Sequence, residues 1–505
     1  MRQQIINYIR AGYAGMYLVS HEEQRVEAEL KSVVEDLNTS KGKDPYSLHA
    51  WSITEGMVDT AKGTTRDCND PLEALTAIDE LPENSILLLR DFHQFFDDPN
   101  PVLVRKLKDE LRVARTTGKT VAVLGCRLHL PPELEREFAV IDFALPDADG
   151  LGVVLDGIAK SARLPLPNGD ARTALIDASR GMTTVEAENA FALSVVENGK
   201  LETSTVAKEK AQAVKKNGLL EIIESTESLE NIGGLDLLKD WLLKRKAAFS
   251  KRAVEYGLPA PKGLLITGIA GTGKSLTAKA TSTVFGLPLL RLDAGKIFAG
   301  LVGQSESNLR SVIQTAEAIA PTVLWIDEIE KGFSGSKSSG STDGGTSARV
   351  FGSFLQWMQE KTAPVFVVAT ANDVSQLPPE MLRKGRWDEL WFVDLPTREE
   401  REAIWRIQIA KYRRDPKDFD IQQLAKTTDG FTGAEIEQVF ISALFDAFEQ
   451  GTEPTELTIG NVLVDFVPLS KLMAEQVSGL RQWAKGRARM ATSQQVERRT
   501  RKIAA

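Results

Sequence analysis

Residues 268–275 read Gly-Ile-Ala-Gly-Thr-Gly-Lys-Ser, and they come directly after the apolar run Leu264-Leu265-Ile266. This order predicts a strand, a glycine-rich loop and a helix that begins at Lys274. In such a loop the glycines let backbone N–H groups turn toward a phosphate, and the positive end of the helix dipole points at the same anion. The spacing G-x-x-x-x-G-K-S/T assigns Lys274 to the β- and γ-phosphate oxygens and Ser275 to Mg²⁺. The sequence therefore predicts a nucleotide site.

A second apolar run, Val323-Leu324-Trp325-Ile326, ends in Asp327-Glu328. An acidic residue at the carboxyl end of a parallel strand faces the ligand crevice. We expect Asp327 to hold Mg²⁺, through water, and Glu328 to polarise the attacking water. Phosphate-loop kinases and GTPases usually lack the second acid, and the chain has no Asn-Lys-x-Asp run that would read guanine. The pattern favours hydrolysis of ATP over transfer of phosphate to an acceptor.

A third predicted strand, Val365 to Thr370, leads to Asn372. A polar side chain at that strand end can hold the same water near the γ-phosphate. Further along, Arg383 and Arg386 flank Gly385. Two arginines at this spacing are ambiguous on their own, because solvated surface charges give the same pattern.

As a set, these motifs resemble a classical-type AAA ATPase. The resemblance extends from about residue 226 to 450, and over the whole chain it points to an AAA family of cyanobacterial and red-algal plastid genomes. The motifs follow the family's order: Asn231-Ile232-Gly233-Gly234, the loop 268–275, Asp327-Glu328, Asn372, the pair Arg383 and Arg386, and Gly430-Phe431-Thr432-Gly433-Ala434-Glu435.

The resemblance implies a P-loop NTPase core of α/β class with a helical lid. It also implies a homo-oligomeric ring, usually a hexamer, with ATP and Mg²⁺ held between neighbours. Arg383 and Arg386 match the arginine fingers, which reach a neighbour's γ-phosphate. Ile232 and Gly233 match the segment near the adenine, while Gly433-Ala434 stands where this clade has Gly-Ala rather than a sensor arginine. The implied nucleotide contacts are Ile232, Gly233, Gly268, Ile269, Ala270, Gly271, Thr272, Gly273, Lys274, Ser275, Leu276, Gly433 and Ala434.

The composition is that of a globular enzyme with two or three domains: 505 residues, of which 42% are hydrophobic and 26% charged. No run approaches the roughly 20 apolar residues of a membrane helix, and the first residues lack the apolar core of a secretory signal. Cys68 and Cys126 have no metal-type spacing, which suits a reducing compartment. We expect a cytoplasmic or plastid-stromal location. A net charge of −8 argues against bulk attraction to nucleic acid.

The first half of the chain repeats the second in a degenerate form. Val121-Ala122-Val123-Leu124 and Leu130-Pro131-Pro132-Glu133 parallel Val367-Val368-Ala369-Thr370 and Leu377-Pro378-Pro379-Glu380. The run Gly181-Met182-Thr183-Thr184-Val185-Glu186 likewise parallels the run that starts at Gly430. Several matches at a nearly constant separation indicate an internal repeat. We therefore expect an α/β module before the ATPase core.

The first copy has lost the chemistry. Ser20-His21-Glu22-Glu23 stands where the phosphate loop belongs, and its acids would repel phosphate. Arg127 or a neighbour replaces the sensor Asn, and no arginine pair follows Pro132. The pattern predicts a pseudo-ATPase that acts as a scaffold, a ring brace or a docking surface. His21, His93 and His129 are scattered and predict no metal site.

A polar, lysine-rich stretch at 199–217 predicts a partly helical linker, and Thr397-Arg398-Glu399-Glu400 is a capping box that opens a helix to about Tyr412. We expect helices at 432–450 and 468–490, and Leu480 and Trp483 suggest that the start of the basic end, Arg481 to Lys502, packs on the lid. The expected domains are a degenerate AAA-like module 1–200, a linker 201–225, an α/β subdomain 226–396, a helical lid 397–470, and a basic C-terminal helix and tail 471–505.

Two loops face the expected pore of such a ring. Protein-threading rings carry an aromatic residue just before Val-Gly, but Leu301 occupies that position here and Phe298 lies three residues earlier. Leu301 either makes weaker apolar contact with a substrate or packs under its own loop. The loop 332–347 is too rich in Gly and Ser to order itself by burial.

Three functions remain open at this point. The complete hydrolytic set favours an ATP-driven remodeller of an unknown protein client. The missing pore aromatic favours an ATP-gated oligomeric scaffold that threads nothing. A nucleic-acid motor is disfavoured by the acidic charge. The basic end, Arg481 to Lys502, is either a solvated helix end or a contact strip for an acidic partner, RNA or a membrane surface.

Overall fold

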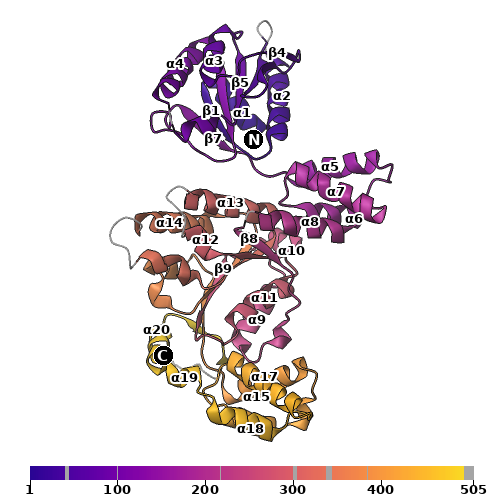
Figure 1. The fold of residues 1–505 in the computed structure, drawn as a ribbon, viewed down its shortest axis with the longest axis vertical. Helices are drawn as coiled ribbons and strands as arrows, with labels where there is room; N and C mark the ends of the chain where they lie inside the picture. Colours follow the sequence, from indigo (N-terminus) through magenta and orange to yellow (C-terminus); the bar gives the residue numbers. More distant parts are fainter. Residues whose placement is uncertain are drawn as a thin grey trace, which may run out of the picture. The chain divides into compact units, whose positions relative to one another are not determined.

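The computed structural model describes residues 1–39, 45–98, 100–216, 218–298, 304–336, 344–383 and 385–493. The chain divides into two compact units, Met1–Lys210 and Ala211–Ala505 (Figure 1). Leu301 lies outside the described residues, as do the Gly/Ser-rich residues 337–343 and the end of the basic tail from residue 494. Among the described helices none is by itself long and apolar enough to cross a membrane, whereas one bent pair, Glu456–Leu472 with Ala474–Ala484, has the length and composition for it.

The first unit is built on a seven-stranded sheet in the order β4-β3-β2-β5-β6-β1-β7. The five strands from β2 to β7 are parallel, and β3 and β4 add an antiparallel edge. The strands are β1 Gly15–Val19, β2 Ser47–Ser52, β3 Gly56–Asp59, β4 Thr64–Arg66, β5 Ser85–Arg90, β6 Thr120–Gly125 and β7 Phe138–Asp142.

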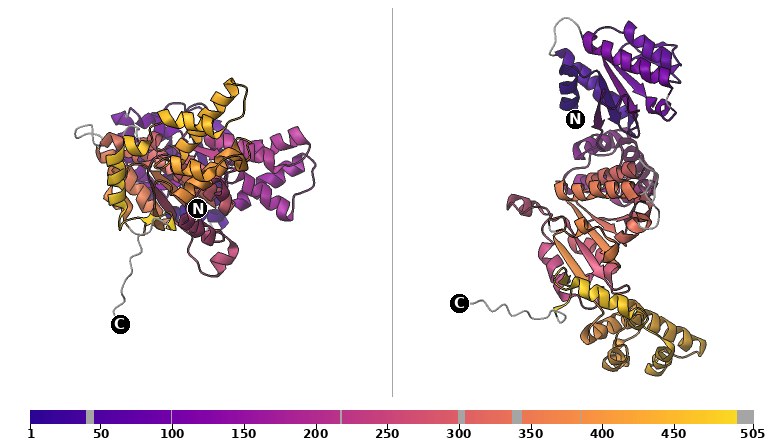
Figure 2. Two further views of the ribbon diagram at one scale, coloured as in Figure 1. Left: turned by 90° about the horizontal axis from the view of Figure 1, so that it is seen from below. Right: turned by 90° about the vertical axis from the view of Figure 1, so that its left-hand side faces the viewer.

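Helices cover both faces of this sheet because its central strands are apolar on both sides. Met16 and Leu18 pack with α1 Arg2–Arg10 and α2 Glu23–Thr39, while Tyr17 packs with α3 Pro71–Thr76 and α4 Pro101–Thr117. Figure 2 shows the indigo and purple helices on opposite sides of the strands. The carboxyl ends of the parallel strands are thereby gathered at one edge.

Four helices follow the first sheet: α5 Ala148–Ser161, α6 Gly169–Ser179, α7 Thr184–Asn198 and α8 Thr203–Lys216. They share an apolar cluster that includes Leu151, Phe191 and Val206. Val206 belongs to α8, so the stretch predicted as a partly helical linker is a helix over Thr203–Lys216 and packs on the preceding helices through this side chain.

The second unit repeats the same plan. Its sheet has the order β14-β13-β9-β12-β11-β10-β8, in which β13 to β10 are parallel and β8 is antiparallel. The strands are β8 Leu220–Ile223, β9 Gly263–Gly268, β10 Leu289–Leu292, β11 Thr322–Ile326, β12 Val365–Ala371, β13 Glu389–Val393 and β14 Arg489–Met490. The helices are α9 Asp236–Arg245, α10 Lys251–Glu255, α11 Lys274–Phe285, α12 Ala294–Phe298, α13 Gln304–Ile319 and α14 Gly344–Glu360.

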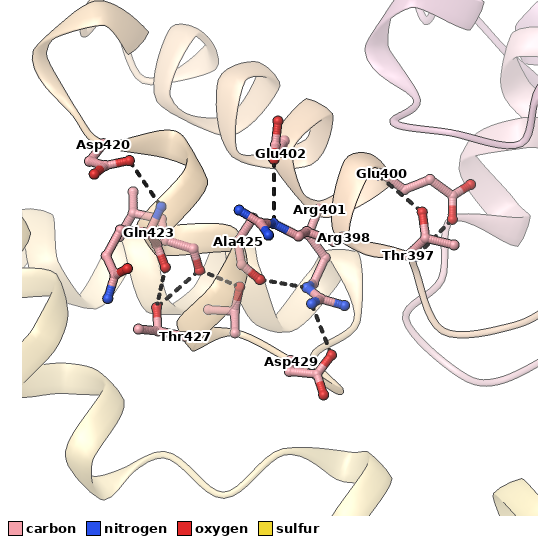
Figure 3. A network of polar contacts seen from close by, with 12 residues as sticks. Thr397, Arg398, Glu400, Arg401, Glu402, Asp420, Gln423, Ala425, Thr427 and Asp429 are labelled. Atoms are coloured by element: carbon pink, nitrogen blue, oxygen red, sulfur yellow. Dashed lines mark hydrogen bonds and ion pairs between the residues drawn. The ribbon is translucent and has the colours of Figure 1, made fainter. Parts of the chain in front are cut away.

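The lid consists of α15 Arg398–Lys411, α16 Ile421–Thr427, α17 Gly433–Glu449 and α18 Glu456–Asp465. The predicted capping box at Thr397 is present, since its side chain accepts from the Glu400 N–H and Glu400 caps Thr397 in return (Figure 3). Arg401 joins α15 to α16: its Nε donates to the Ala425 carbonyl at 2.9 Å. These bonds fix the first turn of the lid.

Glu400 also joins distant segments of the chain. One oxygen, Oε1, accepts from the Leu235 N–H at 3.0 Å and from the Thr492 hydroxyl at 2.6 Å. The other oxygen accepts from the Thr397 N–H. The start of the lid is therefore bonded both to the segment before α9 and to the chain that follows β14.

The C-terminal segment packs differently from the sequence-based expectation. After α19 Leu469–Leu472, helix α20 Ala474–Ala484 places Leu480 and Ala484 in the apolar cluster of the α/β core, together with Phe392 of β13. Leu480 and Trp483, which were predicted to pack on the lid, pack on the α/β core instead. The beginning of the segment does contact the lid, since the Leu469 N–H donates to the Glu435 carboxylate of α17 at 2.6 Å. Strand β14 then extends the sheet beside β13.

Candidate nucleotide site

The glycine-rich loop joins β9 to α11 as the sequence predicts. Lys274 is the first residue of α11, and its ammonium group is buried, donating to the carbonyls of Gly268 at 3.0 Å and Ile269 at 2.6 Å. Burial lowers the pKa of Lys274 to about 8, although Glu330, Asp327 and Glu328 oppose that shift. A buried cation at a helix N-terminus can hold the phosphate groups of a nucleotide.

Two glycines, which lack a Cβ, let the α/β core and the lid approach each other closely. Gly271 has a φ of +76°, and an added Cβ would lie 2.9 Å from the Thr432 hydroxyl at the start of α17. Gly233, before α9, approaches the lid so closely that a Cβ would lie 2.4 Å from Cγ1 of Ile404. Side chains at either position would force the lid away from the α/β core.

Three oxygens meet at the end of β11. Asp327 Oδ1 accepts from the Ser275 hydroxyl at 3.0 Å and from the Thr370 hydroxyl at 2.5 Å. A carboxylate and hydroxyl groups are hard oxygen ligands of the kind that Mg²⁺ takes. Ser275 and Asp327 thus fit a magnesium ion, directly or through water.

Glu328 follows with a strained backbone, since its φ is +48°. Its N–H donates to the Thr370 hydroxyl at 3.0 Å, and its Oε1 accepts from the Asn372 side-chain amide at 2.9 Å. A non-glycine residue in this region is uncommon and costs about 1–3 kcal/mol. The strain turns the carboxylate toward Asn372 at the pocket.

Glu330 supports the same corner from behind. It is 6% exposed, and its Oε1 accepts from the Asn372 N–H at 2.9 Å. Burial raises the pKa of Glu330, with the backbone hydrogen bond acting against it. Glu330 was not among the predicted site residues, although it lies only two positions after Glu328.

The side chains of Lys274, Ser275, Asp327, Glu328 and Asn372 line one pocket of about 880 Å³. Of the sequence-predicted residues, most line it: Ile232, Gly233, Ala270, Gly271, Thr272, Gly273, Lys274, Ser275, Leu276, Asp327, Glu328, Asn372, Gly433 and Ala434. Gly268 and Ile269 are not among the lining residues; they face Lys274 through their carbonyls.

One wall of the pocket comes from α15 of the lid. Ile404, Ile407, Gln408 and Lys411 line it at helical spacing. The helix was predicted from the sequence, but its residues were not predicted to line the nucleotide site. The signal was the i, i+3, i+4, i+7 pattern of a single helix face. The pocket thus lies between the α/β core and the lid, and the Ala434 N–H closes it by donating to the Gly271 carbonyl at 3.1 Å.

Arg383 and Arg386 do not line the pocket of their own chain. Two hydrogen bonds hold their turn: the buried Trp387 indole donates to the Met381 carbonyl at 2.9 Å, and Lys262 donates to the Gly385 carbonyl at the surface at 2.9 Å. Arg383 is exposed, and Arg386 contacts the Glu380 carbonyl. The turn therefore presents two cations at the surface in a fixed geometry.

The corresponding edge of the first unit has the opposite chemistry. Three residues, Ser20 to Glu22, join β1 to α2, where five join β9 to α11. Glu22 is 7% exposed, and its carboxylate accepts from the Thr184 N–H at 2.6 Å and pairs with Arg25. An anion of the protein itself thus lies at the start of α7.

A cation of the protein lies beside it. Arg90 ends β5 at the register position that Asp327 holds after β11. Its guanidinium pairs with Glu27, with Glu55 at 2.7 Å and with Glu23 at 3.4 Å. The first unit fills both the anion and the cation positions with its own side chains, so this edge lacks the groups that hold a nucleotide and a metal ion.

Comparison with protein families matches four separate segments of the chain. Residues 264–395 match the model of the ATPase family associated with various cellular activities (AAA), and residues 418–459 match an AAA+ lid domain. Residues 1–143 match the SpoVK-like AAA ATPase N-terminal domain, and residues 149–217 match the second domain of the same group.

Curated relatives cover nearly the full chain. An uncharacterized AAA domain-containing protein ycf46 of Pyropia yezoensis is 40% identical over 491 residues, which is 96% of this chain and 98% of the relative. Proteins of the same printed name from Trieres chinensis and Guillardia theta are each 38% identical, over 98% and 96% of this chain and over 98% and 95% of their own length.

Proposed function

We propose that this chain, which belongs to the AAA ATPase family, binds ATP with Mg²⁺ between its second α/β core and its lid and hydrolyses it there. The observation that carries the proposal is the arrangement at the end of β11. Asp327 is bonded to Ser275 of the glycine-rich loop, and Glu328 is bonded to Asn372 of the neighbouring strand. The oxygens of Asp327 and Ser275 suit a metal ion, and the carboxylate of Glu328, held by the Asn372 amide, suits a water molecule.

Each group has a separate role in this proposal. The loop amides and Lys274 bind the phosphates, while Ser275 and Asp327 hold the metal. When bound there, Mg²⁺ supplies positive charge to the β- and γ-phosphate oxygens. Ile232 and Gly233, opposite α15, contact the adenine.

Glu328 orients the attacking water and takes up its proton. Asn372 holds the Glu328 carboxylate in place, and the Glu330 carboxylate holds the Asn372 backbone. The strained backbone at Glu328 keeps its side chain aimed at the pocket. Pre-organisation of this kind lowers the barrier because no group has to reorient as the reaction proceeds.

We further propose a homo-oligomeric ring, a hexamer in analogy with the family, with Arg383 and Arg386 acting on the neighbour's ATP. The position of their turn supports this, since it is rigid, exposed and away from the pocket of its own chain. A supplied arginine is worth about 10³–10⁵ in rate. The ring would complete each site with a cation from the next subunit.

The work done by hydrolysis is the remodelling of a protein client in the cytoplasm or plastid stroma. A protein partner fits the acidic net charge of −8 better than nucleic acid does. An ATP-gated scaffold is the second candidate, and Leu301 in place of a pore aromatic favours it.

A capture experiment tests the proposal. Glu328→Gln should bind ATP, hydrolyse it slowly and retain a client through affinity purification, whereas Lys274→Ala should bind neither. If Glu328→Gln assembles with ATP and captures nothing that Lys274→Ala lacks, the scaffold is the better function. Turnover of ATP by Glu328→Gln at the wild-type rate would refute the assigned role of Glu328.

The ring has its own test. Arg386→Ala should bind ATP and hydrolyse it poorly, and mixing it with Lys274→Ala should restore part of the activity, because a mixed interface joins an intact loop to an intact arginine. Subunit exchange is checked first by labelling. If mixed rings form and no activity returns, the arginines do not act between subunits.

A further inference from the structure

A thiol and a buried imidazole face each other in the first unit, far in sequence from the ATP pocket. Cys126 follows β6 directly and is exposed, whereas His93, after β5, is only 3% exposed. Cys126 Sγ lies 3.7 Å from His93 Nε2. On the other side of the ring, Nδ1 lies 4.0 Å from Oδ1 of Asp91. The three side chains follow one another as thiol, imidazole and carboxylate.

Packing rather than hydrogen bonding holds this imidazole. Nδ1 of His93 is buried and has no hydrogen-bond partner among the described residues. The ring lies against Gly125, where an added Cβ would come within 2.7 Å of Nδ1. An unsatisfied buried polar atom costs about 1–3 kcal/mol, and in a native structure it calls for an explanation. A role toward the adjacent thiol provides one.

Burial of the ring favours a neutral imidazole. Burial lowers the pKa of His93; Asp91 and Asp97 oppose this shift, and Arg127 and His129 add to it. A neutral ring has one N–H, and in one tautomer Nδ1 carries it, 4.0 Å from the nearest Asp91 oxygen and without a hydrogen bond. Nε2 then presents its lone pair to the thiol of Cys126, as a base does in Cys–His pairs.

We propose that Cys126 is a reactive thiol that forms a mixed disulfide with small disulfides of the glutathione class. The thiol proton passes to His93 Nε2, and the sulfur attacks one sulfur of the disulfide. The old S–S bond breaks as the new one forms. The released thiolate then takes the proton from the imidazolium, so that one disulfide and one thiol are consumed and one of each is produced.

The position of the pair explains why it is accessible. By strand register, Cys126 stands where Asn372 stands in the second unit, and His93 stands where Glu330 stands. Both lie at the carboxyl edge of the sheet, where α/β proteins bind their ligands. The edge that holds the water-orienting groups in one unit holds a thiol and its base in the other.

The chain carries its own reference thiol. It contains two cysteines, and the one other than Cys126, Cys68, is 3% exposed within the apolar cluster of Trp51 and Phe92. Burial raises the pKa of Cys68. Cys68 should stay unmodified as long as the unit is folded, so its labelling reports unfolding in any variant.

The test treats the full-length protein with oxidised glutathione at pH 7 and follows the adduct on each cysteine by peptide mass spectrometry. Cys126 should react at least about tenfold faster than N-acetylcysteine, whose thiol is only a few per cent ionised at this pH. Cys126→Ser should abolish the adduct. An adduct on Cys68 instead, or a Cys126 rate no higher than that of N-acetylcysteine, would overturn the proposal.

Two variants examine the base. His93→Gln should slow the reaction of Cys126 about tenfold while Cys68 stays protected. If Cys68 becomes reactive, the fold has opened and the decision passes to Asp91→Asn, whose exposed side chain can be changed without disturbing the core; it should slow Cys126 about threefold. An unchanged Cys126 rate in a variant that keeps Cys68 protected would also overturn the proposal.

Discussion

The two α/β units share a backbone plan and differ in what fills it. Both sheets run through the same order of five parallel strands, β7-β1-β6-β5-β2 in the first and β13-β9-β12-β11-β10 in the second. Even local strain is shared, since Asp91 has a φ of +53° at the position where Glu328 has +48°. The side chains at the corresponding edges nevertheless carry opposite charges in the two units.

This difference shows how a nucleotide fold remains stable without a nucleotide. In the second unit a buried Lys274 and the acids of β11 leave room for an anion and a metal ion. In the first, Glu22 occupies the anion position and Arg90 the cation position. Buried charges are tolerated only when they are paired. The first unit pairs them internally, so the contact between its sheet and its helices does not depend on a ligand.

The largest predicted effect distinguishes the carboxyl edges of the two sheets. Glu328→Gln should lower the rate of ATP hydrolysis by about 10²–10⁴, because it removes the base that positions the water. Arg90→Gln, at the corresponding edge of the first unit, should leave that rate unchanged. Both are measured as steady-state phosphate release. A comparable loss in Arg90→Gln would mean that the first unit takes part in the chemistry.

The next prediction tests the internal anion. Glu22→Ala should destabilise the first unit by about 1.5–3 kcal/mol, because the Thr184 N–H and Arg25 lose a charged acceptor. Hydrogen exchange followed by mass spectrometry should show the loss of protection in α7. The control is Glu22→Gln, which keeps an acceptor and should lose less. Unchanged protection of α7 in both variants would contradict the role assigned to Glu22.

A third prediction concerns the edge of the second unit, where we propose that the phosphates of ATP bind. Lys274 has a pKa of about 8 without ATP, so its charge is lost as the pH rises through 8. ATP requires the charged form and should bind with proton uptake. Between pH 7 and 9 the affinity should fall about tenfold. Calorimetry in buffers of different ionisation enthalpy measures both quantities, and a pH-independent affinity would contradict the prediction.

The smallest effect comes from two equivalent helix caps. Thr183 and Thr432 each form a capping box, at the starts of α7 and α17. Replacement of either by Ala should cost about 1 kcal/mol of stability. Thr432→Ala alone should also weaken ATP binding, because Gly433 and Ala434 line the pocket. Equal effects on ATP binding would erase this distinction between the units.

The sequence predicted those parts of the molecule whose signals are local. Buried strands are short apolar runs, and the phosphate loop is a contiguous motif, so β9, β11, β12 and the residues of the loop were identified directly. The predicted family and fold class are confirmed by the family models and the sheet order. The roles of the site residues remain predictions.

The features that were missed depend on contacts between distant residues. Glu22 meets Thr184 across 162 positions, and Glu400 meets Leu235 across 165. The pairing of Cys126 with His93 depends on the order of β5 and β6 in the sheet. The packing of α8 was not predicted beyond a partly helical linker, and Leu480 and Trp483 were predicted to pack on the lid, because composition does not say which surface a helix covers.

The hydrogen bonds of Glu400 fix one end of the lid. They join the start of α15 to the segment before α9 and to the chain after β14, so the lid is anchored beside Ile232 and Gly233. On the other side of the pocket, the Ala434 N–H donates to the Gly271 carbonyl and joins the start of α17 to the glycine-rich loop. From there α17 extends about 25 Å. Any tilt at its first turn is delivered at its far end, where Phe445 and Phe448 are 71% and 84% exposed.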